Sequence, residues 1–541
     1  MTQLAPHIFD LLYQQGVRHA FGIPGDFALT LFDALAESKI EPVVMTHEPC
    51  VGFAADAYSR MRGLGLAVVT YSVGGLNMAN AVAGAYAEKS PLIILSGSPG
   101  VRERQERDLL HHKVKTFDTQ RRVYEELTLY AETLDDPATA DAKIHRAIDY
   151  AMTFKRPVYL EIPRDMVYAE IEEAKHQPLP LKRTIPEALE DAIAETVEML
   201  QNARSPVMLA CAEVHRFGLQ EKVVALAEKL GIPVCSTMLG KSTFPEGHPQ
   251  YAGVYNGEAG DPYARNLVEE SDCLLMLGVF MTDINLGMFT AHLNPAKSIY
   301  ATSERIAIAH HEYPNILFED FVNTLCDRAD LPHRDPSHLI QMQPRVAPSY
   351  GRISMSGLLW ELNQFIDSNT LLVADVGDSL FAADDIRMQA GTSFLCPAFY
   401  ASMGFGIPGT IGAQIADPFR RAIALVGDGA FQMTGMELLT AKRLGLNPIV
   451  IVVNNGSFTS LRSMAHEDSS FVKIPTLDYA QLAKVLGGRG FVVETGEQLH
   501  QALQDAYECE TFSLLDVRLL PEDVSPALQQ LSELFAKTLK G

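Results

Sequence analysis

The segment VGDGAFQMTGMELLTAKRLGLNPIVIVVNN, residues 426–455, places an acid after one apolar run and an amide after the next. Asp428 follows the first run and Asn455 ends the second, with a helical pattern between them. Because consecutive strands of a parallel sheet are usually neighbours, we expect the two side chains to converge beyond the carboxyl ends of the strands. Carboxylate and amide oxygens suit Mg²⁺. The segment therefore predicts a metal site at a sheet edge.

The same segment offers room for an anion. Gly427 and Gly429 carry no side chain, so the backbone can approach a phosphate, and the helix expected to begin near Ala430 and Phe431 has free N–H groups. Gly-Asp-Gly or Asn-Asn alone is equally consistent with an ordinary turn. Together, with each ending a β-branched run, they indicate a site that holds a metal and a phosphate.

The alternation of short apolar runs with helical patterns extends through the whole chain. It predicts an α/β fold of three consecutive doubly wound parallel-sheet domains, at residues 1–171, 188–330 and 353–541. Residues 172–187, which contain Pro178, Pro180 and Pro186, and residues 331–352 show no periodicity and are interpreted as linkers. Functional residues are expected just after the strands.

Composition restricts the class of protein. The 541 residues carry a formal charge of −23 and no basic tail, which disfavours nucleic acid and anionic membranes as partners. The seven cysteines are dispersed, without Cys-x-x-Cys spacing, as expected in a reducing compartment. The N-terminal pattern is not that of a signal peptide, and no uncharged apolar run is long enough to span a bilayer. A cytoplasmic location is predicted.

The segment 426–455 resembles the cofactor-binding motif of thiamine diphosphate (ThDP) enzymes. This resemblance implies that ThDP is bound through Mg²⁺, with Asp428, Asn455 and the backbone carbonyl of Ser457 as metal ligands. It also places further backbone groups near the diphosphate, namely those of Gly377, Asp378 and Ser379 in DVGDS, of Gly427, and of Ala430 and Phe431.

The first domain supplies the second half of such a site. EPVVMTHEPCVGFAADAYSR, residues 41–60, resembles the pyrimidine-binding domain of the same enzymes, which implies that Glu48 activates the cofactor. Without the resemblance, Glu48 is a favourable acid at a helix N-terminus. In YASMGFGIPG, residues 400–409, Met403 corresponds to the wedge beneath the bent cofactor and the carbonyl of Ala401 to an acceptor for its amine; a core role is the alternative for Met403.

A histidine pair points to the reaction. His111 and His112 in ERDLLHHKVKTFDTQ, with Asp26 in GIPGDF, resemble the signature of 2-oxo acid decarboxylases of the pyruvate and indolepyruvate type. In those enzymes this acid and the two histidines form a proton relay at the substrate. Taken alone, adjacent histidines in a polar segment carry no function, so the inference depends on the surrounding motifs.

One position departs from the pyruvate decarboxylase pattern. In NNGSFTSLRSM, residues 454–464, Leu461 stands where a glutamate is expected, an absence shared with phenylpyruvate decarboxylases. In that subgroup an acid of the middle domain replaces it, and the matching stretch GVFMTDINLG gives Asp283 beside Thr282; a solvated turn is the alternative. An apolar Leu461 favours phenylpyruvate and indolepyruvate, then branched or long linear 2-oxo acids.

The resemblance also implies partners. The two halves of the cofactor site come from different subunits in this superfamily, so a homodimer is the minimum and a homotetramer, a dimer of dimers, is expected. The central domain has no clear dinucleotide-binding fingerprint, so we do not expect FAD as a cofactor. The competing hypotheses are a carboligating enzyme of the acetolactate-synthase type and a non-catalytic relative. The amphipathic pattern of residues 521–541 is consistent with a helix that caps the site or with a surface helix.

Overall fold

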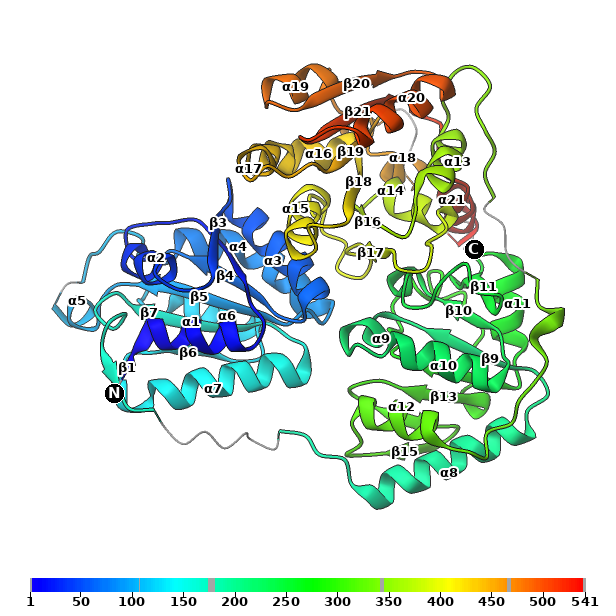
Figure 1. Ribbon diagram of the computed structural model, residues 1–541, viewed down its shortest axis with the longest axis horizontal. Coiled ribbons are helices and arrows are strands. Elements are labelled where there is room, and N and C mark those ends of the chain that lie inside the picture. The colour runs from blue at the N-terminus through cyan, green and yellow to red at the C-terminus, as the bar shows by residue number, and fades with distance from the viewer. Residues whose placement is uncertain (1, 107, 174–180, 341–344, 465–468, 539–541) are drawn as a thin grey trace.

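The computed structural model describes residues 2–106, 108–173, 181–340, 345–464 and 469–538. Three α/β units follow one another along the chain, each with helices on both faces of a sheet (Figure 1). The expected fold class is therefore confirmed. Residues 174–180 and 341–344, in the two expected linkers, and residues 539–541 lie outside the described residues.

The first sheet is entirely parallel, in the order β3-β2-β4-β5-β7-β6. Its strands are β2 (His19–Gly22), β3 (Glu41–Val44), β4 (Gly65–Val69), β5 (Leu92–Ser98), β6 (Ala131–Thr133) and β7 (Val158–Pro163). The helices around it are α1 (Leu4–Gln14), α2 (Leu29–Ala36), α3 (Glu48–Arg62), α4 (Val73–Ala87), α5 (Val101–Glu106), α6 (Thr119–Leu127) and α7 (Pro137–Phe154). The short strands β1 (Thr2–Gln3) and β8 (Glu170–Ile171) pair separately, so the N-terminus is tied to the end of the unit.

The central sheet departs from the purely parallel expectation at one edge. Its order is β11-β10-β9-β12-β13-β14-β15. Short turns join β13 to β14 (Ile306–Ile308) and β14 to β15 (His311–Tyr313), so both of these pairs are antiparallel. The other strands are β9 (Pro206–Ala210), β10 (Val234–Ser236), β11 (Tyr251–Val254), β12 (Cys273–Leu277) and β13 (Ser298–Ala301). Helices α8 (Pro186–Asn202), α9 (Ala212–Arg216), α10 (Gln220–Leu230), α11 (Pro262–Glu270) and α12 (Phe318–Asp327) flank it. Pro186 begins α8 instead of ending the linker, because proline is favoured in the first helical turn.

The third sheet is parallel, in the order β17-β16-β18-β19-β21-β20. Its strands are β16 (Thr370–Ala374), β17 (Ser393–Leu395), β18 (Arg421–Gly427), β19 (Ile449–Asn454), β20 (Arg489–Val493) and β21 (Ser513–Arg518). Its helices are α13 (Met355–Phe365), α14 (Asp378–Ala382), α15 (Gly406–Ala416), α16 (Asp428–Thr434), α17 (Leu438–Arg443), α18 (Thr459–Met464), α19 (Tyr479–Val485), α20 (Gly496–Tyr507) and α21 (Pro526–Thr538). Because β18 and β19 are neighbours, with Gly427 opposite Val453, the two motif ends meet at one edge.

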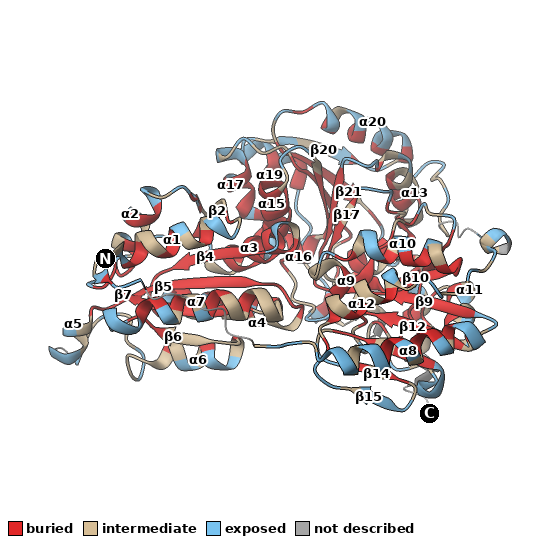
Figure 2. Cartoon of the chain, turned by 60° about the horizontal axis from the view of Figure 1, so that its bottom comes forward, coloured by how far each residue is buried: buried red, intermediate tan, exposed pale blue. Residues whose placement is uncertain are grey.

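Helices α3 and α15 join the first and third units of the same chain. Every residue of α15 is buried, as are most of α3, and the two helices form a continuous buried layer (Figure 2). A Cβ on Gly412 would lie 2.1 Å from the carbonyl oxygen of Ala54, so only glycine permits this backbone approach. Small residues in both helices thus fix how the two units sit against each other.

Candidate functional site

Asp428 and the Asn-Asn loop are hydrogen-bonded to each other. Oδ2 of Asp428 accepts from the backbone N–H groups of Asn455, at 3.1 Å, and Gly456, at 2.7 Å, while Oδ1 accepts from Gly429 N–H at 2.8 Å. The backbone N–H of Ser457 donates to Oδ1 of Asn455 at 3.2 Å. The acid and the amide therefore lie together at the carboxyl ends of β18 and β19. Helix α16 begins at Asp428 itself, two residues before the expected start.

A cavity of about 250 Å³ opens beside this pair. It is lined by residues 376–379, Ala401, Met403, 427–430, Val453, Asn455 and 457–461. A Cβ on Gly427 would meet nothing within 4 Å, so the backbone here faces open space. Burial raises the pKa of Asp428 to about 6, although three backbone N–H groups lower it. A nearly buried acid with no cation among its recorded contacts is suited to a metal ion.

The loop that carries Ala401 and Met403 is held by a buried acid. Asp375 accepts from the N–H groups of Gly404, at 3.0 Å, and Gly406, at 2.6 Å. Ala401 has a φ of 56°, a strained value for a residue with a side chain. Both Ala401 and Met403 line the cavity, so the alternative of a core role for Met403 does not describe its position.

Two residues whose backbones were expected near the diphosphate, Asp378 and Phe431, have side chains that contact other parts of the protein. Asp378 accepts from the hydroxyl, at 2.5 Å, and the N–H of Ser525, just before α21, and burial raises its pKa to about 6. The ring of Phe431 packs against Tyr479, with centroids 5.1 Å apart, and Phe431 does not line the cavity. Helix α21 packs against α14 and α18, two helices that border the cavity, but none of its residues is among those that line the cavity.

Asp26 and the histidine pair form a second polar cluster in the first unit. Oδ2 of Asp26 lies 2.5 Å from Nε2 of His111, and Oδ1 lies 3.6 Å from Nε2 of His112. Burial raises the pKa of Asp26, but the hydrogen bond and charge of His111 outweigh it and leave the pKa below its ordinary value. The ring of His111 stacks on Phe27, with centroids 4.7 Å apart. Three titratable groups thus meet at a partly exposed surface.

Glu48 begins α3, on the same unit as this cluster. Its Oε2 accepts from the side-chain amide of Asn77 at 2.7 Å, and the carboxylate is partly exposed. None of Glu48, Asp26, His111 and His112 is among the residues that line the cavity of the third unit of the chain. Within one chain, the residues expected from the first unit therefore lie outside the cavity at Asp428.

Three models of the thiamine pyrophosphate enzyme family match the chain: the N-terminal TPP binding domain over residues 2–121, the central domain over 193–318 and the C-terminal TPP binding domain over 375–517. The chain is 39% identical to indole-3-pyruvate decarboxylase from Azospirillum brasilense, covering 100% of this chain and 98% of that protein. It is 28% identical to pyruvate decarboxylase from Aspergillus fumigatus, with 100% and 98% covered, and 28% identical to pyruvate decarboxylase 4 from Arabidopsis thaliana, with 94% and 87% covered.

The chain belongs to the thiamine pyrophosphate enzymes. Thiamine diphosphate is therefore its cofactor. The residues of the third unit fit it, because the cavity combines a buried acid, an amide and glycine backbone that faces open space.

Asp283 and Thr282 of this thiamine pyrophosphate enzyme lie in the turn after β12. Thr282 is buried and its Oγ1 accepts from the N–H of Asn285 at 3.1 Å. Oδ1 of Asp283 accepts from the N–H of Ile284 at 2.9 Å. Neither residue lines the cavity at Asp428 in this chain. Their side chains are engaged within the turn itself.

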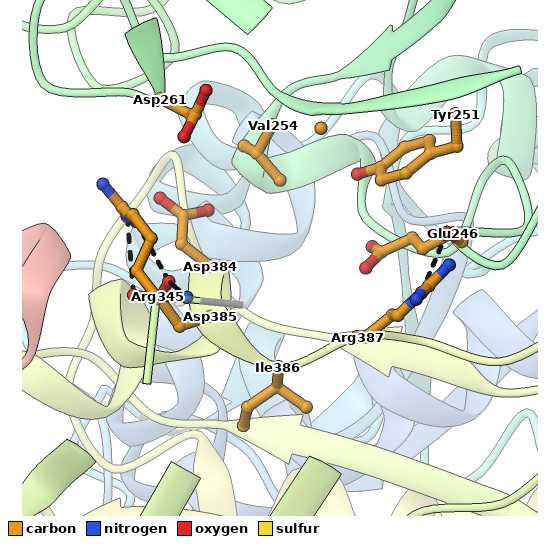
Figure 3. A pocket seen from close by; sticks show the side chains of 10 residues that line it. Glu246, Tyr251, Val254, Asp261, Arg345, Asp384, Asp385, Ile386 and Arg387 are labelled. Atoms are coloured by element: carbon orange, nitrogen blue, oxygen red, sulfur yellow. Dashed lines mark hydrogen bonds and ion pairs between the residues drawn. The ribbon is translucent and has the colours of Figure 1, made fainter. Parts of the chain in front are cut away.

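A second cavity lies between the central and third units (Figure 3). Its volume is about 60 Å³, far smaller than the first. Several of its charges pair within the protein: Arg345 with Asp385, and Lys241 with Glu246. Of the described residues around it, Asp384 has a carboxylate oxygen without a hydrogen-bond partner, and burial raises its pKa to about 7. The cavity is too small for a cofactor the size of ThDP.

Two supporting residues escaped prediction from the sequence. Asp375 stands within the quoted DVGDS but carries no local signal that its partners are Gly404 and Gly406. Ser525 likewise has no recognisable sequence signal, and its contact with Asp378 depends on the packing of α21. None of the described helices is long and apolar enough to cross a membrane.

Proposed function

We propose that this thiamine pyrophosphate enzyme decarboxylates 2-oxo acids without oxidation, releasing CO₂ and an aldehyde. The observation that carries the proposal is the cluster of Asp26, His111 and His112, in which the Asp26 carboxylate is hydrogen-bonded to His111 and lies 3.6 Å from Nε2 of His112. Release of an aldehyde requires proton transfers at the substrate, and such a cluster can supply them. The names of the similar proteins, an indole-3-pyruvate and two pyruvate decarboxylases, support the same reaction.

Bound ThDP supplies an electron sink that makes loss of CO₂ possible. The remaining tasks fall to the chain. Asp428, Asn455 and the carbonyl of Ser457 would hold Mg²⁺, with the backbone of Gly427 and Gly377 to Ser379 beside the diphosphate. Met403 would set the bend of the cofactor by steric exclusion, and the carbonyl of Ala401 would accept from its amine.

Glu48 would act as the acid that activates the cofactor of a partner subunit. Its position outside the Asp428 cavity of its own chain supports a homodimer as the minimum assembly, with a homotetramer as the expected form. Exposed apolar side chains beside both half-sites also support burial by a partner: Val73 is 52% exposed on α4, and Met433 and Met436 are each 54% exposed around α16.

Aromatic substrates are proposed to be preferred. Leu461 lines the cavity and is 53% exposed, so it offers an apolar surface beside the cofactor. Phenylpyruvate and indolepyruvate are the leading candidates, followed by branched or long linear 2-oxo acids. Because apolar contacts give only about 1–3 kcal/mol of discrimination, we expect broad tolerance. Asp283, with Thr282 beside it, is also proposed to supply an acid to the substrate site, although both residues lie outside the Asp428 cavity of their own chain.

The dispersed cysteines support a cytoplasmic location, since all seven are free. The test of the reaction is incubation of the purified protein with phenylpyruvate, ThDP and Mg²⁺. We expect phenylacetaldehyde and CO₂ in equal amounts. Acyloin as the main product, with little free aldehyde, would instead favour the carboligating alternative, and no product with a bound cofactor would favour a non-catalytic relative.

A further inference from the structure

Glu437 is a fully buried acid that joins the third unit to the corner before Glu48. It ends the short 3₁₀ turn η5 (Gly435–Glu437), which continues directly from α16, and its exposed fraction is 0%. Its two carboxylate oxygens lie 3.2 Å from the backbone N–H of Thr46, and Oε2 accepts from the Thr46 hydroxyl at 2.6 Å. Oε1 accepts from the hydroxyl of Thr440 at 2.5 Å. One carboxylate therefore gathers donors from two units.

The contacts fall on both sides of Glu48. Thr46 precedes Glu48 by two positions, and Cys50 follows it by two. Burial raises the pKa of the Cys50 thiol, and the charge of Glu437 and a hydrogen bond to it raise it further, so the thiol remains a protonated donor facing the carboxylate. Two residues before Thr46, the carbonyl of Val44 accepts from the guanidinium of Arg443. The corner from β3 into α3 is thus clamped onto the segment that follows Asp428.

Burying an acid without a cation is costly unless hydrogen bonds satisfy it. No salt bridge to Glu437 occurs among the described residues, so its neutral donors are its compensation. A methionine or leucine would fill the same space at lower cost if packing were the only task. The acid instead fixes the direction of Thr46, and through it the start of α3, where Glu48 stands.

We infer that Glu437 is a positioning residue for Glu48. It holds residues 44–50 in one position against the third unit, so that the Glu48 carboxylate faces the cofactor in a fixed orientation. The inference rests on the proposed role of Glu48 as the activating acid. Because Glu437 and Asp428 belong to one continuous segment, the metal ligand of a chain and the acid that the same chain offers to its partner are aligned by the same element.

The test uses the enzyme loaded with Mg²⁺ and ThDP, without substrate, and measures exchange of the cofactor C2 proton for deuterium by quenched-flow NMR. Glu437→Ala removes hydrogen bonds to a charged acceptor, and we expect exchange and kcat to slow together by about tenfold or more. KM and the affinity for ThDP should stay within about twofold. Glu437→Gln retains an acceptor for Thr46 and should recover most of the exchange rate.

Two further variants complete the design. Thr46→Val removes one donor while leaving Glu437 in place, and it carries the test if Glu437→Ala does not fold; exchange should again slow. Asp385→Asn is the matched control, since Asp385 is also a buried acid, which accepts from the N–H of Arg345 in the chain segment leading into the third unit; exchange should be unchanged.

Normal exchange in both Glu437→Ala and Thr46→Val, with a loss of thermal stability like that of the control, would overturn the inference. The proposed function fails separately, and recognisably, if Glu48→Gln itself leaves exchange unaffected. In that case the contacts of Glu437 would serve only the packing of β3 and α3. If Glu48→Gln slows exchange and the Glu437 variants do not, only the positioning role is lost.

Discussion

Replacing Asp428 with asparagine separates two effects of this carboxylate. Its ionised form destabilises the cofactor-free protein, and it strengthens the binding of Mg²⁺ and ThDP. Burial raises the pKa of Asp428 from 3.8 to about 6. A raised carboxyl pKa means that the folded state holds its proton more tightly, so this group's contribution to stability is fully present below about pH 4 and is lost as pH rises through 6. Above pH 6 the ionised form costs about 3 kcal/mol.

The asparagine variant removes that cost but loses hydrogen bonds. Its amide NH₂ must face one of the N–H groups of Gly429, Asn455 or Gly456 that now donate to the acid. Allowing about 1–2 kcal/mol for this mismatch, the net gain at pH 8 is about 1–2 kcal/mol. A domain of this size then unfolds at a temperature about 2–8 °C higher. At pH 5 the advantage should shrink by about 1.4 kcal/mol, because the wild-type acid is largely protonated there.

The assay is differential scanning calorimetry at pH 5 and pH 8, with and without Mg²⁺ and ThDP. Ligand at a hundred times its Kd stabilises the wild type by about 2.7 kcal/mol, and the variant should lose most of this gain because a neutral amide is a weaker metal ligand. Asn447→Ala, at an amide remote from the cavity, serves as a control that retains the ligand effect. An Asp428→Asn protein stabilised by Mg²⁺ and ThDP as strongly as the wild type would refute the assignment of Asp428 as a metal ligand.

Three further predictions concern the other half-site and the substrate. Glu48→Gln should lower kcat at least about 100-fold while ThDP still binds, because an amide cannot share a proton as the acid does; isothermal titration with ThDP and a rate assay decide, and normal turnover would contradict the role. Asp26→Asn should lower kcat by about 100-fold and change the acid limb of the kcat–pH profile, since the pKa of Asp26 is held below its ordinary value and the group is ionised near neutrality; an unaltered profile would remove Asp26 from the proton relay. Leu461→Glu should shift kcat/KM from phenylpyruvate towards pyruvate by about tenfold or more, because a carboxylate replaces apolar surface in the cavity, and an unchanged ratio of the two values would show that Leu461 does not set selectivity.

Several residues that the sequence motifs single out lie close together in the structure, as predicted. The Gly-Asp-Gly and Asn-Asn ends meet because both close neighbouring parallel strands, and strand order follows from short crossovers. Asp26 and the histidine pair, which are separated by seven elements of the first unit, lie close together, as the decarboxylase signature implied. In both inferences, a local sequence pattern determines almost completely which residues lie close together in the fold.

What the sequence determined by itself is the repeated strand–helix alternation, and hence three α/β sheets with mostly parallel strands and the edges at which the candidate residues lie. The tertiary structure alone decided the supporting contacts: Asp375 with Gly404 and Gly406, Asp378 with Ser525, and Glu437 with Thr46. The antiparallel strands β14 and β15 also appeared only there. Periodic burial is a local property that repeats along the chain, whereas a hydrogen bond between residues far apart leaves no periodic trace, because only the packed fold brings its donor and acceptor into reach.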